Sequence, residues 1–587
     1  MPENRHGKRR IIDSRRISTV KRKKAEKNWY IAYAGKFVAI AVAAGVLAGC
    51  SGHAAGDSTA DWKQSENQIS EEEGQDENTK DRQQKQSDAG RKDGNTGESP
   101  IIEDKKITMG EIEVSLEPED EYNSWDENTA VKIELQDSQI AIKGQGAKAE
   151  GSTVTITEGG TYVLEGTLSN GSVLVDAKED SQVRLVLKGA DIHSESSAAI
   201  DIKKAAKTII SLEEGTINSL SDSQGLIYRS EEKEEPNGAL FCKGDLTING
   251  SGTLKVDGAF NNAVSCKDIL KITGGTIEVT AANHGIKGND ALVIYDGQLR
   301  ITATGDGVKS DILAAVLGGD TQILDCEEGL EAENVVIQGG KIELTARDDG
   351  INASTDGNNT PQIYFMGGDV TLRAEGDGID SNGSVYMSGG QVTVYGSSRR
   401  DNGALDYDRE FKLTGGVLAA FGPGGMDQNV SSADSQVSVL ADFGQSLKAG
   451  TEVTLRDSQG NELYKGRGEK DFRTVVISVP EMAVGGRYEI AAGENVISFV
   501  AEQTVTYVNE EGIQKEAAMG FGRGGPRRQG GPGSRAGAGE EWKPEERPKL
   551  PEGGEGGRRL ELPEERERLE AQGNPNRQLP EERKGGE

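Results

Sequence analysis

A unit of about 22 residues recurs between Asn283 and Tyr407. Each unit has a polar residue before a glycine and a small or aliphatic residue, and these glycines stand at positions 285, 307, 329, 350, 378 and 403. The steps between them are 22, 22, 21, 28 and 25 residues. Each unit also carries a second turn, such as Gly339-Gly340. A repeat of this length is typical of a solenoid, in which each unit packs on its neighbours.

Apolar residues alternate with polar ones on both sides of the second turn, which predicts strands with one buried face. The same position is apolar in successive units, so stacked units would place like on like. An antiparallel sandwich explains the alternation but not the period. We therefore predict an all-β parallel β-helix with coils about 4.8 Å apart. The column five residues before the second glycine contains Leu270, Leu292, Ala314, Val335, Ile363, Val385 and Phe411.

The amino-acid composition distinguishes predicted disordered segments from the solenoid. The segment after residue 50 is polar and nearly free of large apolar residues, and the C-terminal segment is rich in Gly, Pro, Arg and Glu, so both are predicted to be disordered. Within the solenoid, residues 213–237 interrupt the period and are predicted to form a loop. The predicted boundaries are 1–50 for a basic region and export signal, 51–100 for a disordered linker, 101–422 for the β-helix, 423–508 for a small β cap and 509–587 for a disordered tail.

The N-terminus resembles that of an exported lipoprotein. A basic stretch precedes an apolar run from Phe37 to Gly49, which is shorter than the roughly 20 residues that a membrane-spanning helix requires. The ending Leu47-Ala48-Gly49-Cys50 resembles a bacterial lipobox. This resemblance implies that Cys50 carries the lipid and holds the chain on the outer face of the cell membrane. The alternative is an uncleaved anchor in which Cys50 is incidental.

The formal net charge is −31, which argues against a nucleic-acid partner and suits an exported protein that is expected to be a monomer. Three cysteines remain after Cys50. Cys242 and Cys266 occupy one position in neighbouring units, so they are expected on adjacent coils. Their proximity allows either a disulfide or two buried thiols. Cys326 has no evident partner, and no cysteine spacing indicates zinc.

Carboxylates recur on either side of the repeated glycine and would form a ladder along one edge of the coils. Neighbouring carboxylates about 5 Å apart repel each other, and Lys309 can neutralise only part of the ladder. Closely spaced hard oxygen ligands suit calcium. We therefore predict a Ca²⁺ site, although acidic residues are also good turn formers that can stay solvated. The predicted metal ligands are Asp306, Glu328, Asp349, Asp377, Asp380, Asp406 and Asp408.

Catalysis on this edge is an alternative to binding. Calcium could hold a uronate while Lys309 or Lys287 removes the adjacent proton, as in a polysaccharide lyase, but both lysines can equally balance charge within the ladder. Paired carboxylates could also hydrolyse a glycoside, although acids are too common here for that pattern to be specific. The sequence contains neither a Ser/His/Asp arrangement nor a phosphate-binding loop. The residues favour binding, and no catalytic residue is assigned.

Several motifs follow one another along the chain, at 153–156, 160–168, 183–189, 377–383, 402–408 and 435–480. Their order resembles that in the extracellular carbohydrate-binding β-helix proteins formerly classed as a domain of unknown function. The resemblance extends from about residue 101 to 507. It implies a right-handed β-helix similar to polysaccharide lyases, bound calcium, and binding of pectic acid and cellulose without established cleavage. The family pattern fits best at Asp377, Asp380, Asp406 and Asp408.

Three functions follow as hypotheses. The first is a surface lipoprotein that binds acidic plant polysaccharide, polygalacturonate-like or cellulose, through calcium and without catalysis. The second is a calcium-dependent polysaccharide lyase. The third is a structural or adhesive solenoid without a glycan ligand. Because an acidic protein repels an acidic polymer, the first hypothesis requires a bridging cation.

Overall fold

The computed structural model describes residues 99–103, 105–137, 139–226 and 235–513. The predicted export signal with Cys50, the linker up to residue 98 and the tail beyond residue 513 lie outside the described residues. Within the described part of the chain, no helix is both long and apolar enough to cross a membrane.

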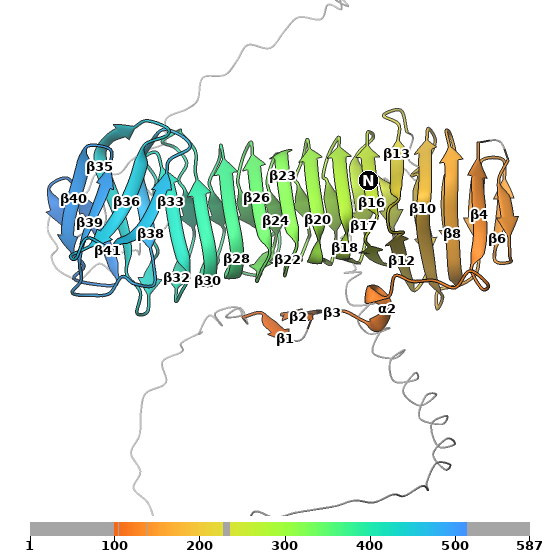
Figure 1. The fold of residues 1–587 in the computed structure, drawn as a ribbon, viewed down its shortest axis with the longest axis horizontal. Coiled ribbons are helices and arrows are strands. Elements are labelled where there is room, and N and C mark those ends of the chain that lie inside the picture. The colour runs from red at the N-terminus through yellow and green to blue at the C-terminus, as the bar shows by residue number, and fades with distance from the viewer. Residues whose placement is uncertain (1–98, 104, 138, 227–234, 514–587) are drawn as a thin grey trace, which may run out of the picture. The chain divides into compact units, whose positions relative to one another are not determined.

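The chain forms a parallel β-helix (Figure 1). Each regular coil supplies one short strand to a 12-stranded sheet and two further segments on either side of the second turn. Strand β20 (Ala291–Ala303) bends at this turn, so its two halves pair with β22 (Leu313–Val316) and β23 (Asp320–Cys326). The predicted fold class is confirmed.

The core is a set of stacked apolar columns. Strand pairing joins Leu270, Leu292, Ala314, Val335, Ile363, Val385 and Phe411 in succession. Every side chain of this predicted column is at most 2% exposed. Full burial of such a side chain stabilises the fold by roughly 1.5–3 kcal/mol, so each coil is stabilised by the next.

The second turn of each coil depends on glycine. Gly319, Gly340, Gly368 and Gly390 have φ angles between 80° and 83°, a left-handed conformation that other residues rarely adopt. A Cβ atom on Gly340 would also lie 2.8 Å from the carbonyl oxygen of Gly318 in the coil below. These glycines allow consecutive turns to stack at the coil spacing.

The 12-stranded sheet carries the polar edge described below. Its strands are β6 (Ala147–Glu150), β7 (Thr153–Ile156), β9 (Ser172–Asp176), β11 (Ile200–Lys204), β14 (Gly238–Cys242), β17 (Asn262–Cys266), β19 (Ile286–Gly288), β21 (Val308–Lys309), β24 (Leu330–Ala332), β27 (Ile351–Ala353), β29 (Ile379–Ser381) and β31 (Leu405–Tyr407).

The other two faces of the coils contain the remaining strands of the stack. In addition to β20, β22 and β23, these are β4 (Val131–Gln136), β5 (Ala141–Lys143), β8 (Gly160–Leu168), β10 (Gln182–Ser194), β12 (Lys207–Leu212), β13 (Ile217–Asp222), β15 (Asp245–Gly250), β16 (Thr253–Gly258), β18 (Ile269–Ala281), β25 (Asn334–Ile337), β26 (Lys341–Ala346), β28 (Gln362–Ala374), β30 (Ser384–Tyr395), β32 (Glu410–Leu413), β33 (Val417–Gly422) and β34 (Ser432–Ala433). Strand β13 lies inside 213–237, where the sequence suggested only a loop. It alternates buried and exposed positions and pairs with β10 and β16, so this coil continues the stack.

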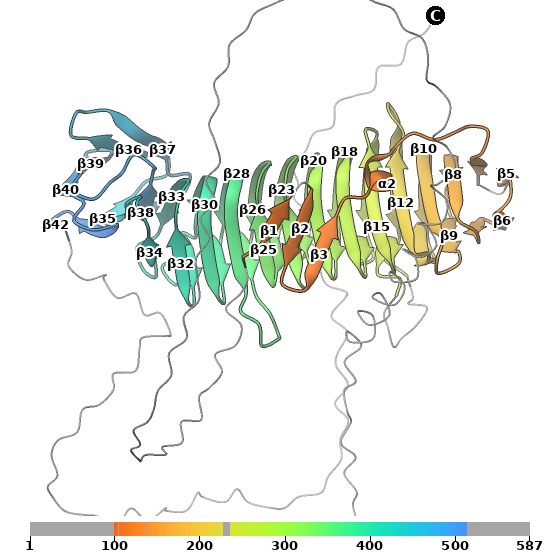
Figure 2. The same cartoon turned by 90° about the horizontal axis from the view of Figure 1, so that it is seen from below.

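An N-terminal segment, residues 101–121, lies outside the coils, and we name it the strap. It comprises the antiparallel strands β1 (Ile101–Glu103), β2 (Lys106–Met109) and β3 (Ile112–Ser115) and the short helix α2 (Pro118–Glu121). Figure 2 shows the strap lying across the outer surface of the stack. The predicted β-helix begins at residue 101, whereas the coil pairing begins with β4.

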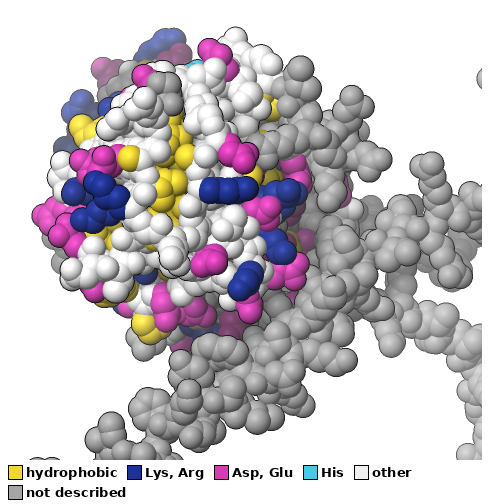
Figure 3. Space-filling model, turned by 90° about the vertical axis from the view of Figure 1, so that its right-hand side faces the viewer, with side chains coloured by type: hydrophobic (Ala, Val, Ile, Leu, Met, Phe, Trp, Pro, Cys, Tyr) yellow, Lys and Arg dark blue, Asp and Glu magenta, His cyan; other side chains and the backbone are white. Residues whose placement is uncertain are grey.

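The two ends of the stack differ. At the N-terminal end, hydrophobic side chains gather at the centre and charged side chains surround them (Figure 3). At the C-terminal end, β38 turns back antiparallel onto β33 and covers the last coil. The cap strands are β35 (Ser438–Leu447), β36 (Glu452–Asp457), β37 (Glu462–Arg467), β38 (Phe472–Ser478), β39 (Arg487–Ala492), β40 (Asn495–Val500), β41 (Val505–Asn509) and β42 (Gly512–Ile513).

The cysteines that were expected on adjacent coils do meet. Cys242 pairs with Cys266 in the strand register, and both are buried free thiols. Each thiol donates a hydrogen bond to the carbonyl oxygen of Gly244. Cys326 is also buried and free.

Candidate functional site

The short strands of the 12-stranded sheet present one outward residue per coil. In β19, β24, β27 and β29 the first and third residues are buried and the second is half-buried, as alternation along a strand requires. The pairing register links these outward residues from coil to coil. Their chemistry changes along the stack from basic to acidic: Lys287, Lys309, Glu331, Asn352, Asp380 and Asp406.

A second column precedes the repeated glycine. Gly285 N–H donates to the carbonyl of Asp306, and the same bond recurs one coil later from Gly307 to Glu328. The column contains His284, Asp306, Glu328, Asp349 and Asp377. We name the two columns together the acidic edge.

The last coil departs from the sequence alignment. The repeat aligned Asn402 with Asp377, but Gly378 N–H donates to the carbonyl of Gly403, and Ile379 pairs with Leu405. Gly403 therefore occupies the column, and Asn402 lies one residue outside it. The longer spacing before this coil shifts its turn by one residue.

One part of the acidic edge contains its own cations, and we name His284, Lys287, Asp306, Lys309 and Glu331 the paired half. Lys309 Nζ lies 2.8 Å from Asp306 Oδ2 and also forms an ion pair with Glu331. His284 Nδ1 lies 3.0 Å from the same oxygen of Asp306. Burial alone would raise the pKa of Asp306, but its hydrogen bonds and charge interactions with His284 and Lys309 together lower it.

The next coils contain aspartates without such partners, and we name Asp349, Asp377, Asp380 and Asp406 the acid-only half. Burial and then the charges of neighbouring carboxylates raise the pKa of Asp349 to about 6, of Asp377 to about 7 and of Asp380 to about 8. The same causes raise the pKa of Asp406. Within the described ranges, none of these four aspartates forms an ion pair with a basic side chain.

Hydrogen bonds satisfy part of the acid-only half. Asp349 Oδ1 accepts from the backbone N–H of Asp377 at 2.7 Å, and Asp377 Oδ1 accepts from Gly403 at 2.5 Å. Asp406 Oδ1 accepts from the Gln428 amide at 2.5 Å. These donors fix the carboxylates in place but supply no positive charge.

Unpartnered oxygen atoms lie where the two halves meet. Asn352 Nδ2 donates to Glu328 Oε1 at 3.0 Å. The other oxygen of each group, Glu328 Oε2 and Asn352 Oδ1, is buried and has no hydrogen-bond partner in the described part of the chain. Burial, together with the charges of Asp306 and Asp348, raises the pKa of Glu328. Oxygen atoms that lack a donor at an anionic position suit a hard cation.

The predicted ligands therefore divide into groups. Asp306, Glu328 and Glu331 are the only described acidic, histidine or cysteine residues whose ligand atoms form a group of three within 4.8 Å, but Lys309 contacts two of them. The four acid-only aspartates are stacked by register without forming such a group. Asp408 is exposed and lies outside both columns, although its charge raises the pKa of Asp380 and Asp406.

Asp348 and Asp427 were not among the predicted site residues. The charge of Asp348 raises the pKa of Asp349 and Asp377, and the Asp348-Asp349 doublet could have indicated this. Asp427 accepts hydrogen bonds from Ala404 N–H at 3.3 Å and from Thr474 Oγ1 at 2.5 Å. Asp427 lies beyond the regular repeat, so no periodic pattern identified it.

The lysines considered as lyase bases are engaged. Lys309 contacts Asp306 and Glu331, and Lys287 Nζ lies 3.3 Å from Asp311. An ammonium group that neutralises carboxylates is poorly placed to accept a proton. This geometry supports charge balance as the role of both lysines.

A family model described as "Carbohydrate-binding domain-containing protein" matches residues 150–325 and 313–461, which together span more than half of the chain. A protein of that description from Acetivibrio thermocellus is 39% identical over 128 residues, which are 22% of this chain and 45% of the relative. The match thus spans less than half of the relative's length. A solved structure titled as the polysaccharide lyase-like protein from C. thermocellum, gadolinium derivative, is 28% identical and has a TM-score of 0.37; the match covers 44% of this chain and 96% of the other.

Proposed function

We propose that this chain, which belongs to the family of carbohydrate-binding domain-containing proteins, binds acidic polysaccharide through divalent cations held by the acid-only half. Family membership supports glycan binding in general. The observation that supports cation dependence is the stack of Asp349, Asp377 and Asp380, whose carboxyl pKa values are raised to about 6, 7 and 8.

Electrostatic repulsion between the protein and an acidic polymer explains why a cation is needed. The chain carries a formal charge of −31, and a polyuronate is also an anion, so the two repel each other without a mediator. A divalent cation that binds carboxylates of both partners replaces this repulsion with attraction. The same cation would relieve the repulsion within the acid-only half.

Calcium fits the oxygen atoms that this edge offers. Ca²⁺ takes six to eight oxygen ligands from carboxylates, amide carbonyls and water in a flexible geometry. Asp377, Asp380 and Asp406 would supply carboxylates, with Asp349 beside them. The unpartnered oxygens of Glu328 and Asn352 extend the donor set toward the paired half. The polymer would complete the coordination from the solvent side.

The predicted lipoprotein signal would place this function at the cell surface. A lipid on Cys50 would hold the β-helix on the outer face of the cell membrane, where polymers too large to enter the cell are accessible. The polar segment between Cys50 and the strap would act as the tether. Calcium available outside the cell would load the acidic edge.

Co-sedimentation with insoluble polygalacturonate, in calcium and in chelator, tests the proposal. We expect the full chain to pellet only with calcium. The double substitution Asp377→Asn with Asp380→Asn should abolish pelleting. Asp356→Asn with Asp369→Asn removes the same charge from exposed positions elsewhere and should not. Absence of pelleting in both conditions would overturn acidic-polymer binding and leave a structural solenoid or another ligand.

A further inference from the structure

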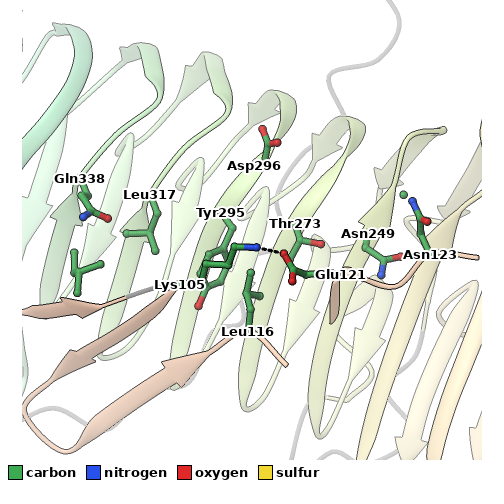
Figure 4. Close-up of a pocket in the computed structure, with 12 residues that line it drawn as sticks. Lys105, Leu116, Glu121, Asn123, Asn249, Thr273, Tyr295, Asp296, Leu317 and Gln338 are labelled. Carbon is green, nitrogen blue, oxygen red and sulfur yellow. Dashed lines mark hydrogen bonds and ion pairs between the residues drawn. The ribbon is translucent and has the colours of Figure 1, made fainter. Parts of the chain in front are cut away.

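A groove of about 480 Å³ lies between the strap and the outer wall of the β-helix, away from the acidic edge (Figure 4). The strap contributes Ile102, Lys105, Leu116 and Glu121 to its lining. Successive coils contribute the opposite wall, so the groove follows the axis of the stack. The wall residues are Asn249, Thr273, Tyr295, Asp296, Leu317 and Gln338.

The strap is firmly attached, so the groove is formed before any ligand arrives. Asp120 of the strap is fully buried, with Oδ1 2.7 Å from Lys207 Nζ and Oδ2 2.9 Å from Lys271 Nζ. Thr247 also donates to Asp120 Oδ1 at 2.6 Å. A site that needs no rearrangement avoids the ordering cost of binding.

Apolar packing holds the rest of the strap. Ile107 and Val114 are at most 1% exposed and pack in one cluster with Val293, Leu313 and Val336 of the coils. Figure 4 shows the strap strands running beside the wall residues. The groove is therefore bounded by ordered elements on both sides.

The lining is chemically mixed in the way that a sugar ring requires. Leu116 and Leu317 offer apolar surface for ring C–H groups, beside the half-buried aromatic ring of Tyr295. Thr273 and Gln338 offer a hydroxyl and an amide group for sugar hydroxyls. Sites for small polar ligands combine apolar walls with a few polar groups in this way.

One lining residue lacks a hydrogen bond that it should have. Asn249 is 1% exposed, and its Nδ2 donates to the carbonyl of Asp120 at 2.7 Å. Its Oδ1 is buried and has no hydrogen-bond partner among the described residues. Buried amide oxygens nearly always accept a hydrogen bond, so this end of the groove is short of one donor.

The charge of the lining selects between classes of sugar. Lys105 is paired with Glu121, as Figure 4 shows. Asp296 is the remaining charged residue among the described residues of the lining, so these residues carry a net charge of minus one. An anionic uronate would meet this charge without a free cation. A neutral sugar meets no such repulsion.

We propose that this groove binds a neutral sugar segment of a polysaccharide chain, as a second glycan site independent of calcium. The proposal rests on the glycan-binding part of the proposed function but not on its cation-dependent part. The strap is then part of a binding site as well as a structural element. Successive coils place Thr273, Tyr295 and Leu317 in a row that a chain of sugars can follow.

Calorimetric titration of the full chain with cellohexaose, xylohexaose and mannohexaose in chelator tests the proposal. We expect at least one of these neutral hexasaccharides to bind. Leu317→Trp fills the groove and should abolish that binding, whereas Leu324→Trp adds the same side chain at an exposed position elsewhere and should not. Absence of binding by all three, or equal binding to both variants, would overturn the proposal.

A second variant tests the groove in case Leu317→Trp does not fold. Asp296→Ala with Gln338→Ala removes two exposed polar groups and should weaken binding about tenfold while the thermal unfolding temperature stays unchanged.

Polygalacturonate pelleting distinguishes the groove proposal from the cation-dependent proposal. If it persists with calcium while no neutral sugar binds, only the groove proposal fails. If neutral sugar binds and polygalacturonate does not pellet, only the cation-dependent proposal fails.

Discussion

The paired half and the acid-only half occupy equivalent positions on the same sheet but balance their charges differently. Lys309 and Asp380 belong to one outward column, three coils apart. In the paired half an ammonium group lies between carboxylates, and the pKa of Asp306 is lowered. In the acid-only half the pKa of Asp380 is raised to about 8. The strand register thus sets the positions of the carboxylates. The presence or absence of a lysine in the column determines whether the acidic edge needs an external cation.

The size of the effect explains why this difference matters. Two carboxylates about 5 Å apart repel by roughly 3 kcal/mol at an effective dielectric constant of 20. A domain is stable by only about 5–15 kcal/mol, so a run of uncompensated pairs is costly. Protonation or a bound cation relieves this cost, and a lysine within the column prevents it.

The largest expected effect comes from removing the cation of the paired half. Lys309→Met leaves Asp306, which is 4% exposed, without its ammonium partner. We expect a loss of about 2–3 kcal/mol in the free energy of unfolding at pH 8 in chelator, measured by urea denaturation. Calcium should restore part of it, because Asp306, Glu328 and Glu331 would then hold the ion.

Lys287→Met provides the matched control for Lys309→Met. Its partner Asp311 has a half-exposed side chain, so the loss should stay below about 1 kcal/mol. Equal losses in the two variants would contradict the contrast between a buried and an exposed partner. A lack of calcium rescue in Lys309→Met would show that these carboxylates cannot replace the lysine by an ion.

The acid-only half should account for stabilisation by calcium. At a calcium concentration of 100 times Kd, one site stabilises the wild type by about 2.7 kcal/mol. Asp377→Asn with Asp380→Asn should remove most of this gain, as measured by thermal unfolding with and without chelator. Glu331→Gln, in the paired half, should keep it. Loss of the gain in Glu331→Gln alone would move the site to the paired half.

The dependence of stability on pH should follow the raised pKa values. Asp349, Asp377 and Asp380 have pKa values of about 6, 7 and 8 when folded and about 4 when unfolded. Between these limits the folded chain binds more protons, so in chelator their contribution to stability falls as pH rises from about 4 to 8. The wild type should therefore lose stability from pH 5 to pH 8 relative to Asp377→Asn with Asp380→Asn. Saturating calcium should reduce this difference in stability between the wild type and the variant. If the wild type gained stability from pH 5 to 8 relative to the variant, these three aspartates would not have raised pKa values.

Apart from the Lys287→Met control, the smallest expected effect concerns His284 in the paired half. His284→Asn removes the contact of its Nδ1 with Asp306 Oδ2 but leaves Lys309 in place. Urea denaturation should show a loss of about 1 kcal/mol, the typical net contribution of one hydrogen bond. The calcium response should be unchanged. A larger loss than in Lys309→Met would show that His284, rather than the lysine, neutralises Asp306.

The stacking of the coils could be predicted from the sequence because it depends on the spacing of residues that are close together in the chain. The apolar column from Leu270 to Phe411 followed from counting residues around a glycine turn, and the pairing confirmed it. The same counting predicted that Cys242 and Cys266 would be neighbours. It failed at Asn402, where the longer spacing shifts the turn and only the hydrogen bond from Gly378 to Gly403 reveals the register.

The candidate site was only partly predictable. The repeat identified the carboxylates of the edge, including Asp349 and Asp377, because each precedes a repeated glycine. It could not show that Lys309 binds Glu331, because side-chain direction and burial depend on the packed coils. Asp427 was missed because it lies beyond the last regular unit, and its contact with Thr474 joins residues 47 positions apart.

The repeat was enough to predict the β-helix and the position of its acidic edge, because stacking units of about 22 residues buries their apolar columns. Which carboxylates are neutralised depends on how the side chains pack. Only the tertiary structure shows that the strap lies outside the coils and forms a groove with them. Coil stacking depends on spacing along the chain, whereas charge balance and the place of the strap depend on contacts such as that of Asp120 with Lys271, which are 151 residues apart.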